Sequence, residues 1–359
     1  MYKRPVVFNK TLVIGILILF FGLCVNSSIG TILEKEPICP IKNGNTLYVG
    51  GTGPGNYSTI QEAIDAASDG DTIFIYSGIY HPISNVHIYK ELCIVGENKE
   101  NVIFEKEYGY KPLSIRAKNV EIRSITFINF EVTNQVQYDN TVISNNIFLI
   151  NNNAGDWNPD IMLIAGKNNE ISNNIFTSTN PGSKRGPFNV VFFQCYESKF
   201  INNIIDGFKS GITAMDILDY SYYVDDYPRG NNTIEGNTFS NNSYGIRLSP
   251  TLYPKYHSKI INNNFIDNEK NAIFYARIPS IMDIIENLIK KFQSPSENYK
   301  LFDLTKKYWD GNYWDDYDGE GPQKISGRVQ TAGLFNQFLL YDFSWVNFDL
   351  HPAKEPFNI

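Results

Sequence analysis

A short motif of apolar residues around an asparagine pair returns along the middle of the chain and constrains the fold more than any other feature. It occurs five times, as ISNNIF (143–148), ISNNIF (171–176), FINNII (200–205), IEGNTF (234–239) and IINNNF (260–265). A looser copy, IRSITF, covers residues 122–127. Such self-similarity is typical of solenoids, in which each repeat buries its apolar face only by stacking on its neighbours.

The copies are unevenly spaced, and we attribute this to a second strand and to insertions of variable length within each repeat. The last apolar residues of successive copies are 21, 28, 29, 34 and 26 residues apart. Second strands are predicted to begin near Ile161, Val190, Ile212 and Ile246. Without the insertions the unit is about 22 residues, a length that fits one coil of a right-handed parallel β-helix.

We therefore predict an all-β fold, a right-handed parallel β-helix of single coils. The aligned isoleucine and phenylalanine positions should form columns in its interior. The paired asparagines should occupy turns, because asparagine tolerates a left-handed backbone and its amide can bond to the asparagine of the next coil.

The two ends of the chain are expected to differ from the repeats. Residues 1–30 have the basic start, the apolar run and the small polar exit of a secretory signal, with an uncleaved anchor as the alternative. No later segment is apolar enough to span a membrane. Residues 31–46 are interpreted as a linker and 47–278 as the β-helix. Residues 279–359 are expected to hold an inserted amphipathic helix at 281–292 and an aromatic cap.

A short helix is also predicted at the start of the solenoid. The stretch Ser58-Thr-Ile-Gln61 has the form of a capping box, and the apolar residues that follow it have helical spacing. Such a helix would cover the open end of the β-helix, where strand edges are otherwise exposed to other chains.

Composition excludes several classes of protein. The formal net charge is −7, so basic side chains for neutralising the phosphates of a nucleic acid are lacking. Four cysteines and four histidines are too few and too scattered for a metal cluster or a disulfide scaffold. After removal of the signal, Cys39, Cys93 and Cys195 allow at most one bridge within the chain, and Cys195 is predicted to be buried in a strand.

Two segments near the start and one near the end of the chain carry a family resemblance. LYVGGTGPGNYSTIQEAIDAASDGDTIFIYSGIY (47–80) and LCIVGENKENVIF (92–104) resemble the opening of secreted pectin-lyase-like β-helix proteins. Within that group the chain is most similar to NosD-like and carbohydrate-binding β-helix repeat proteins of archaea and bacteria. The segment WDGNYWDDYDGEGPQKISG (309–327) resembles the aromatic and acidic block that closes many archaeal members. The resemblance implies the fold. It supplies no catalytic residues, because the motifs of polygalacturonases and pectin methylesterases are absent.

Metal binding is not predicted. NosD-like proteins are linked to copper, which favours histidine, methionine and cysteine ligands. His81 and His87 are six positions apart, and we interpret them as isolated turn or surface residues. The acidic residues of 309–320 have the right oxygen ligands for calcium, but their spacing does not match an EF-hand, so an end cap is favoured.

The insertions are the predicted location of ligand binding. Residues 150–160 and 177–189 follow the motif on adjacent coils, whereas 214–232 and 249–259 follow the second strand on the next two. Each pair should form a wall above the solenoid, and loops on a rigid scaffold commonly carry binding sites. Aromatic rings that can stack on sugars and carboxylates that accept hydrogen bonds are concentrated there. These candidates are Asp216, Asp219, Tyr222, Tyr223, Asp225, Asp226, Tyr227 and Tyr256 on the larger wall and Trp157 on the other.

The predicted function is a secreted or cell-surface β-helix protein without chemistry of its own, which binds polysaccharide or contributes to the cell envelope. The alternative is a divergent polysaccharide lyase or glycoside hydrolase in which Asp225 or Asp226 acts as acid or base with a partner on another coil. A NosD-like accessory factor is a third hypothesis. Another surface protein is a further candidate partner, because solenoids offer long surfaces.

Overall fold

The computed structural model describes residues 44–105, 111–134, 138–150, 161–178, 189–208, 210–215, 230–249, 258–278, 309–332 and 339–359. The chain divides into two units, residues 1–41 and 42–359, and all described residues belong to the second. The predicted signal, nearly all of the linker and the predicted helix at 281–292 lie outside the described residues. No described helix is long and apolar enough to cross a bilayer.

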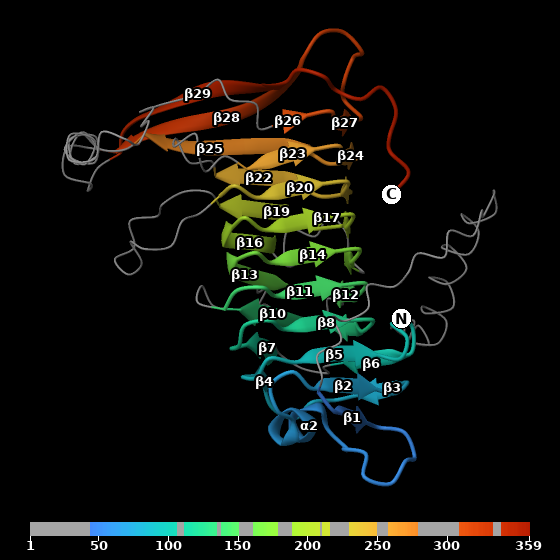
Figure 1. Ribbon diagram of the computed structural model, residues 1–359. Helices are drawn as coiled ribbons and strands as arrows, with labels where there is room; N and C mark the ends of the chain where they lie inside the picture. Colours follow the sequence, from blue (N-terminus) through green and yellow to red (C-terminus); the bar gives the residue numbers. More distant parts are fainter. Residues whose placement is uncertain are drawn as a thin grey trace, which may run out of the picture. The chain divides into compact units, whose positions relative to one another are not determined.

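Three long sheets run side by side along a stack of coils (Figure 1). Sheet A contains, in spatial order, β1 (Thr46–Val49), β2 (Thr72–Ile75), β5 (Cys93–Gly96), β8 (Glu121–Arg123), β11 (Val142–Ser144), β14 (Glu170–Ser172), β17 (Lys199–Ile201), β20 (Thr233–Glu235), β23 (Lys259–Ile261) and β26 (Trp309–Asp310). Sheet B contains β3 (Gly78–Tyr80), β6 (Val102–Glu105), β9 (Thr126–Ile128), β12 (Ile147–Ile150), β15 (Ile175–Ser178), β18 (Ile204–Asp206), β21 (Thr238–Ser240), β24 (Asn264–Ile266) and β27 (Tyr313–Trp314). Sheet C contains β4 (Val86–Ile88), β7 (Lys111–Ile115), β10 (Phe130–Asn134), β13 (Met162–Lys167), β16 (Asn189–Tyr196), β19 (Ser210–Met215), β22 (Ile246–Ser249), β25 (Ala272–Ile278), β28 (Gln323–Ala332) and β29 (Leu339–Asp349).

From β2 onward, each coil contributes one strand to each sheet in the order A, B, C. Neighbouring strands within the sheets are parallel, except that β29 pairs antiparallel with β28. The predicted all-β fold of a parallel β-helix is confirmed. The predicted second strands are the strands of sheet C, with β13, β16, β19 and β22 beginning within two residues of the expected positions.

The repeat motif holds two strands, where the sequence analysis treats it as one. In the first ISNNIF copy, Ile143 lies in β11 of sheet A, and Phe148 lies in β12 of sheet B. The asparagine pair between them, Asn145 and Asn146, turns the chain from one sheet to the next. Two strands of three or four residues each are too short to show a periodicity of their own, so the corner is not visible in the apolar pattern.

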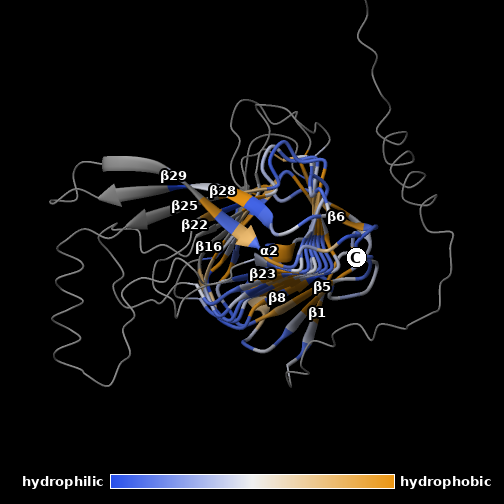
Figure 2. Ribbon diagram, turned by 90° about the horizontal axis from the view of Figure 1, so that it is seen from above, coloured by the Kyte–Doolittle hydropathy of each residue, from blue (hydrophilic) through white to orange (hydrophobic). Residues whose placement is uncertain are grey.

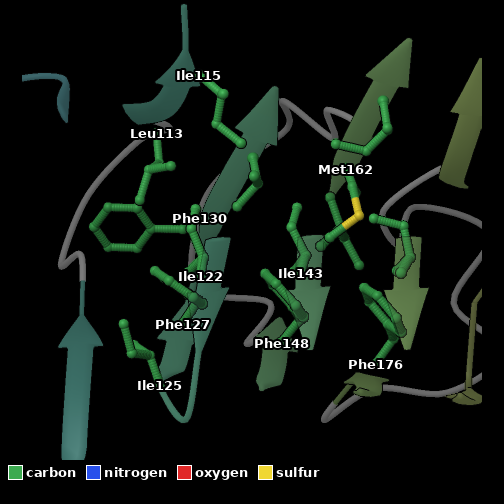
Figure 3. Packing of buried hydrophobic residues seen from close by; sticks show 14 of the residues in the cluster. Leu113, Ile115, Ile122, Ile125, Phe127, Phe130, Ile143, Phe148, Met162 and Phe176 are labelled. Carbon is green, nitrogen blue, oxygen red and sulfur yellow. The ribbon is translucent and has the colours of Figure 1, made fainter. Parts of the chain in front are cut away.

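The interior consists of the predicted columns of apolar side chains. The coils superpose when viewed along the stack (Figure 2), and their buried apolar side chains form one continuous cluster. In sheet B the phenylalanine rings lie above one another, with centroids 5.2 Å apart for Phe127 and Phe148 and 4.9 Å apart for Phe148 and Phe176 (Figure 3). The rings in each pair are stacked and nearly parallel, with interplanar angles of 14° and 8°. Burial of each ring depends on the coil above and below it, so the coils stabilise one another.

The two asparagines of each pair have different roles. The first has a left-handed backbone, with φ of 54° at Asn145, 55° at Asn173 and 54° at Asn202. This conformation is tolerated best by asparagine and glycine. The second is buried and belongs to an interior ladder, as predicted for amides that bond from coil to coil. The ladder consists of Asn146, Asn174, Asn203, Asn237, Asn263 and Asn312.

The ladder has a direction. In each step the backbone N–H and the Nδ2 of one asparagine donate to the Oδ1 of the asparagine in the next coil, as Asn174 does to Asn203 at 2.9 and 3.1 Å. The second hydrogen of each Nδ2 donates to a carbonyl of the preceding coil, as in Asn174, whose Nδ2 lies 2.8 Å from the carbonyl of Ile143. Because each Oδ1 accepts from the preceding coil, the last asparagine needs an acceptor at the C-terminal end. Asp349 of β29 supplies it, because its Oδ2 accepts from Asn312 N and Nδ2, both at 3.0 Å. A carboxylate suits this position because it only accepts hydrogen bonds.

The N-terminal end is covered by α2 (Ile60–Ala66), close to the predicted position. Its capping box is formed by Thr59 and Glu62, one residue later than the predicted pair Ser58 and Gln61. Both pairs satisfy the sequence pattern. Ser58 instead donates its hydroxyl to the Glu62 carboxylate at 2.8 Å.

The C-terminal end differs from the prediction. The parallel coils extend beyond the expected boundary at residue 278, because β26, β27 and β28 add one strand to each sheet. The aromatic block predicted as a cap is therefore the last coil. Trp309 and Trp314 close the apolar columns of sheets A and B by pairing with Ile260 and Phe265. A 30-residue connection precedes this coil, which hides its relation to the repeats.

The described cysteines behave differently from one another. Cys195 is fully buried in β16, as predicted, and its thiol donates to the carbonyl of Ile164 at 3.2 Å. Cys93 in β5 is disulfide-bonded. One bridge within the chain is the maximum that the sequence permits, and Cys39 lies outside the described residues.

Candidate functional site on sheet C

The long connections of the solenoid are confined to the borders of sheet C. From β8 to β27, every turn from sheet A to sheet B consists of two residues. After β2, every connection longer than five residues starts or ends at a strand of sheet C. The longest are 151–161, 179–188, 216–232, 250–258 and 279–308. Sheet C is thus the face of the solenoid at which the connections vary in length.

The insertions border sheet C on two different sides. Those at 151–161 and 179–188 precede β13 and β16, whereas those at 216–232 and 250–258 follow β19 and β22. The first predicted pair therefore connects to the N-terminal ends of sheet C strands and the second pair to their C-terminal ends. We call these two sides the edges of sheet C. The segment 279–308 follows β25 and leaves from the same edge as the second pair. From the sequence alone this segment is expected to belong to a C-terminal cap, because β26, the strand that follows it, is not recognisable as part of a further coil.

The predicted site residues themselves lie outside the described residues. This applies to Asp216, Asp219, Tyr222, Tyr223, Asp225, Asp226, Tyr227, Tyr256 and Trp157. Their assignment to a ligand site therefore stays a prediction.

The described residues resume at Gly230, near the end of the insertion 216–232, and Gly230 lies beside a cluster of polar side chains. The N–H of Gly230 donates to the carbonyl of Cys195 at 2.8 Å, and the carbonyl of Gly230 accepts from Glu197 N at 3.2 Å. Beside this corner, Lys167 Nζ lies 3.2 Å from Glu197 Oε2 and 5.5 Å from the centre of the Tyr196 ring. The cluster of Lys167, Tyr196 and Glu197 thus marks the trailing edge of sheet C.

A second cluster, of one tyrosine and two cations, lies at the opposite edge, where the strands of sheet C begin. Tyr244 occupies the turn before β22, and both Arg247 and Lys270 approach its ring, at 5.6 and 5.8 Å from the centroid. Contacts of this kind fix an aromatic ring without burying it. Both edges of sheet C therefore carry a positioned tyrosine and positive charge.

A hollow of about 630 Å³ lies at the N-terminal end of the same sheet, between α2 and β4. Its walls come from helix α2, from the segment between β3 and β4, and from the residues around β4. They are Gln61, Asp65, Ile83, Ser84, Asn85, His87 and Tyr89. The amide of Gln61 pairs with β4 as a further strand would, accepting from His87 N at 2.9 Å and donating to its carbonyl at 3.3 Å.

The electrostatics of the hollow are set by Asp65 and Tyr89, which share a short hydrogen bond between the phenol and Oδ1. Gln61 Nε2 donates to the same oxygen at 2.8 Å. Donation by Tyr89 and then by Gln61 lowers the pKa of Asp65. The same bond to Asp65 raises the pKa of Tyr89, because ionisation of the phenol would end its donation.

We expect Asp65→Asn to destabilise the protein slightly at neutral pH and not at all in acid. Because the pKa of Asp65 is lowered by folding, its ionised form contributes stability above the ordinary carboxyl pKa of about 4. This contribution is lost as the pH falls through the lowered pKa. Urea unfolding of both proteins from about pH 7 to about pH 3 measures the difference. Tyr89→Phe should show the same trend, and a difference that stays constant with pH would contradict the assignment.

The four residues of the hollow that carry its chemistry were not among the predicted candidates. Gln61 and Asp65 are four apart on α2, and His87 and Tyr89 are two apart around β4. Spacings of four in a helix and two in a strand place each pair on one face. The sequence does not show that the two faces meet. His87 was interpreted as an isolated surface residue.

The acidic residues of the last coil, considered above for calcium, bind donors of the protein itself. Asp315 accepts from Asp267 N at 2.5 Å and from Asn271 Nδ2 at 2.8 Å. Asp316 accepts from Asn271 and Gln323 at 2.9 and 3.0 Å. Within the described ranges, no three histidine, cysteine, aspartate or glutamate side chains gather as metal ligands would.

Comparison with known proteins yields similarity of structure only. No family model matches the chain, and no curated protein matches its sequence. A pectin methylesterase mutant in complex with a hexasaccharide is 13% identical, with 63% of this chain and 80% of that chain covered and a TM-score of 0.42. The A-module of a mannuronan C-5 epimerase from Azotobacter vinelandii is 17% identical, with 64% and 75% covered and a TM-score of 0.42. The class that the three sheets define is the parallel β-helix.

Proposed function

We propose that this chain is an extracellular or cell-surface β-helix protein that binds polysaccharide across sheet C without chemistry of its own. The observation that carries the proposal is that every connection longer than five residues after β2 borders this one sheet, while the turns between sheets A and B keep two residues from β8 onward. Binding residues are commonly placed on variable loops that a rigid scaffold positions.

The residue types at these borders suit a carbohydrate. Tyr196 and Tyr244 are held at opposite edges by cations, and the insertions contain further tyrosines and aspartates in their sequence. Aromatic faces pack against the apolar faces of sugar rings, and carboxylates accept hydrogen bonds from hydroxyl groups. A long sheet with such borders favours an extended polymer over a small molecule.

Export is part of the proposal. The pattern of residues 1–30 is that of a secretory signal, and Cys93 is disulfide-bonded. Disulfides persist mainly in oxidising compartments outside the cytosol. A NosD-like accessory role is less well supported, because the thiol of Cys195 is buried in the core and donates to a backbone carbonyl.

The proposal predicts retention of the protein on a polysaccharide and its loss when the tyrosines bordering sheet C are removed. Affinity electrophoresis of residues 31–359 in acidic and neutral polysaccharides, with and without calcium, measures retention. Tyr244→Ala and the pair Tyr222→Ala/Tyr223→Ala should each weaken it about tenfold or more, as truncation of central aromatic contacts does. The matched control is Tyr48→Ala/Tyr76→Ala, which removes two stacked rings from sheet A.

The same incubations are assayed for new chain ends. Turnover that disappears in Asp225→Asn or Asp226→Asn would make the protein a lyase or hydrolase and contradict binding without chemistry. Equal losses of retention in the sheet A control and the sheet C variants would contradict the location. Absence of both retention and turnover across the panel would overturn the carbohydrate proposal and favour a protein partner or a structural role in the envelope.

A further inference from the structure

The hollow between α2 and β4 has the features of a binding site in its own right. Its volume of about 630 Å³ lies within the range of about 300–1,000 Å³ that is usual for small-molecule sites. We infer that it binds one neutral sugar unit. The inference deepens the proposed function, since the hollow lies beside β4, the first strand of sheet C, where a polymer on that sheet would end.

Two apolar groups give the hollow a surface for a sugar ring. Tyr89 is 47% exposed, and its hydroxyl is tied to Asp65, which fixes the orientation of the ring. Ile83 is 90% exposed, more than any other large hydrophobic residue in the described part of the chain. Neither side chain is needed for the core. An ordered aromatic ring beside an exposed aliphatic group is suited to the apolar face of a pyranose.

Polar groups with unused capacity lie between these two. Both hydrogen bonds to Asp65 end on Oδ1, which leaves Oδ2 without a partner among the described residues. The Nδ1 atom of His87 is buried and also has none. Ser84 and Asn85 add a hydroxyl and an amide on the third side.

The charges favour a neutral sugar over an acidic one. Neither lysine nor arginine lines the hollow. Lys90, whose Nζ lies 5.8 Å from the centre of the Tyr89 ring, donates its ammonium group to the carbonyls of Ile64, Asp65 and Ala67 at 3.0, 2.8 and 2.5 Å. An ammonium has three donors, so none is left for a uronate. The ionised Asp65 carboxylate would repel the carboxylate of such a sugar.

Binding of single sugars tests the inference directly. The full chain is titrated in calorimetry and in saturation-transfer NMR with methyl glycosides of glucose, galactose and mannose, and with methyl glycosides of the corresponding uronic acids, which keep a free carboxylate. At least one neutral glycoside should bind, and each uronate should bind more weakly than its neutral counterpart. Tyr89→Ala and Ile83→Asp should each weaken binding about tenfold, whereas Tyr48→Ala, an exposed tyrosine of sheet A, should leave it unchanged.

The variants separate binding from folding. Ile83 is almost fully exposed, so Ile83→Asp changes the hollow without removing a core contact. The inference is overturned if no neutral glycoside binds, if a uronate binds better, or if binding survives both Tyr89→Ala and Ile83→Asp. Retention on a polysaccharide without binding of any single sugar would refute this inference alone. Binding of a single sugar without retention on any polysaccharide would refute the proposed function alone.

Discussion

Replacing Asp349 by asparagine is expected to lower the free energy of unfolding by about 3–5 kcal/mol. The side chain is fully buried, and five donors point at its two oxygens. Oδ2 accepts from Asn312 N, Asn312 Nδ2 and Trp314 Nε1, and Oδ1 accepts from Gly311 N and His351 N. An amide replaces one acceptor by a donor, so either the two part-buried donors on Oδ1 or the three buried donors on Oδ2 lose their partner.

Urea unfolding followed by circular dichroism measures this effect. The matched control is Asp318→Asn in an exposed turn, where one backbone N–H, that of Glu320, donates to the carboxylate. That change should cost about 0.5 kcal/mol or less. Equal midpoints for Asp349→Asn and the native protein would show that Asp349 does not terminate the ladder.

Asn203→Ala is expected to cost about 3 kcal/mol, because it breaks the ladder in its middle. Its Oδ1 accepts from Asn174 N and Nδ2, and its Nδ2 donates to the carbonyl of Ile171 at 2.9 Å and to Asn237 Oδ1 at 3.1 Å. Alanine would leave both donors of Asn174 and one carbonyl unsatisfied in a site without access to water. The same urea experiment measures the loss.

The neighbouring Asn202 offers a matched control. It is exposed and has a φ of 54°, a conformation that glycine adopts without strain. The equivalent position in the same corner of the next coil is Gly236, which has a φ of 64°. Asn202→Gly should therefore cost much less than Asn203→Ala. If the two variants unfold at the same urea concentration, the buried ladder does not stabilise the fold as described.

The sequence predicted the coil, the interior columns and the role of the asparagine pairs because these features repeat at matched positions. It predicted sheet C separately from the motif, but it did not reveal that the motif bends between Asn145 and Asn146. The ladder is visible in the motif, whereas its terminus is not. Asp349 is 37 positions from Asn312, and only the antiparallel return of β29 brings the two together.

The candidate site was predictable in part. Loop lengths in the sequence indicate which coils carry insertions, and the order of strands places them at two edges of one sheet. The hollow beside β4 could not be predicted, because it requires contact between residues more than 20 positions apart, such as Gln61 and His87. The register of the first coil and the packing of α2 determine that contact, and neither leaves a repeated pattern in the sequence.

The central claim, that polysaccharide lies on sheet C, is tested most directly by hydrogen–deuterium exchange with and without a polysaccharide that retains the protein. We expect slower exchange with the polymer in the strands of sheet C from β13 to β25 and in the insertions 151–161, 179–188, 216–232 and 250–258. Strands of sheets A and B in the same coils should be unchanged. Protection confined to sheets A or B, or no protection in a protein that the polymer retains, would contradict the account.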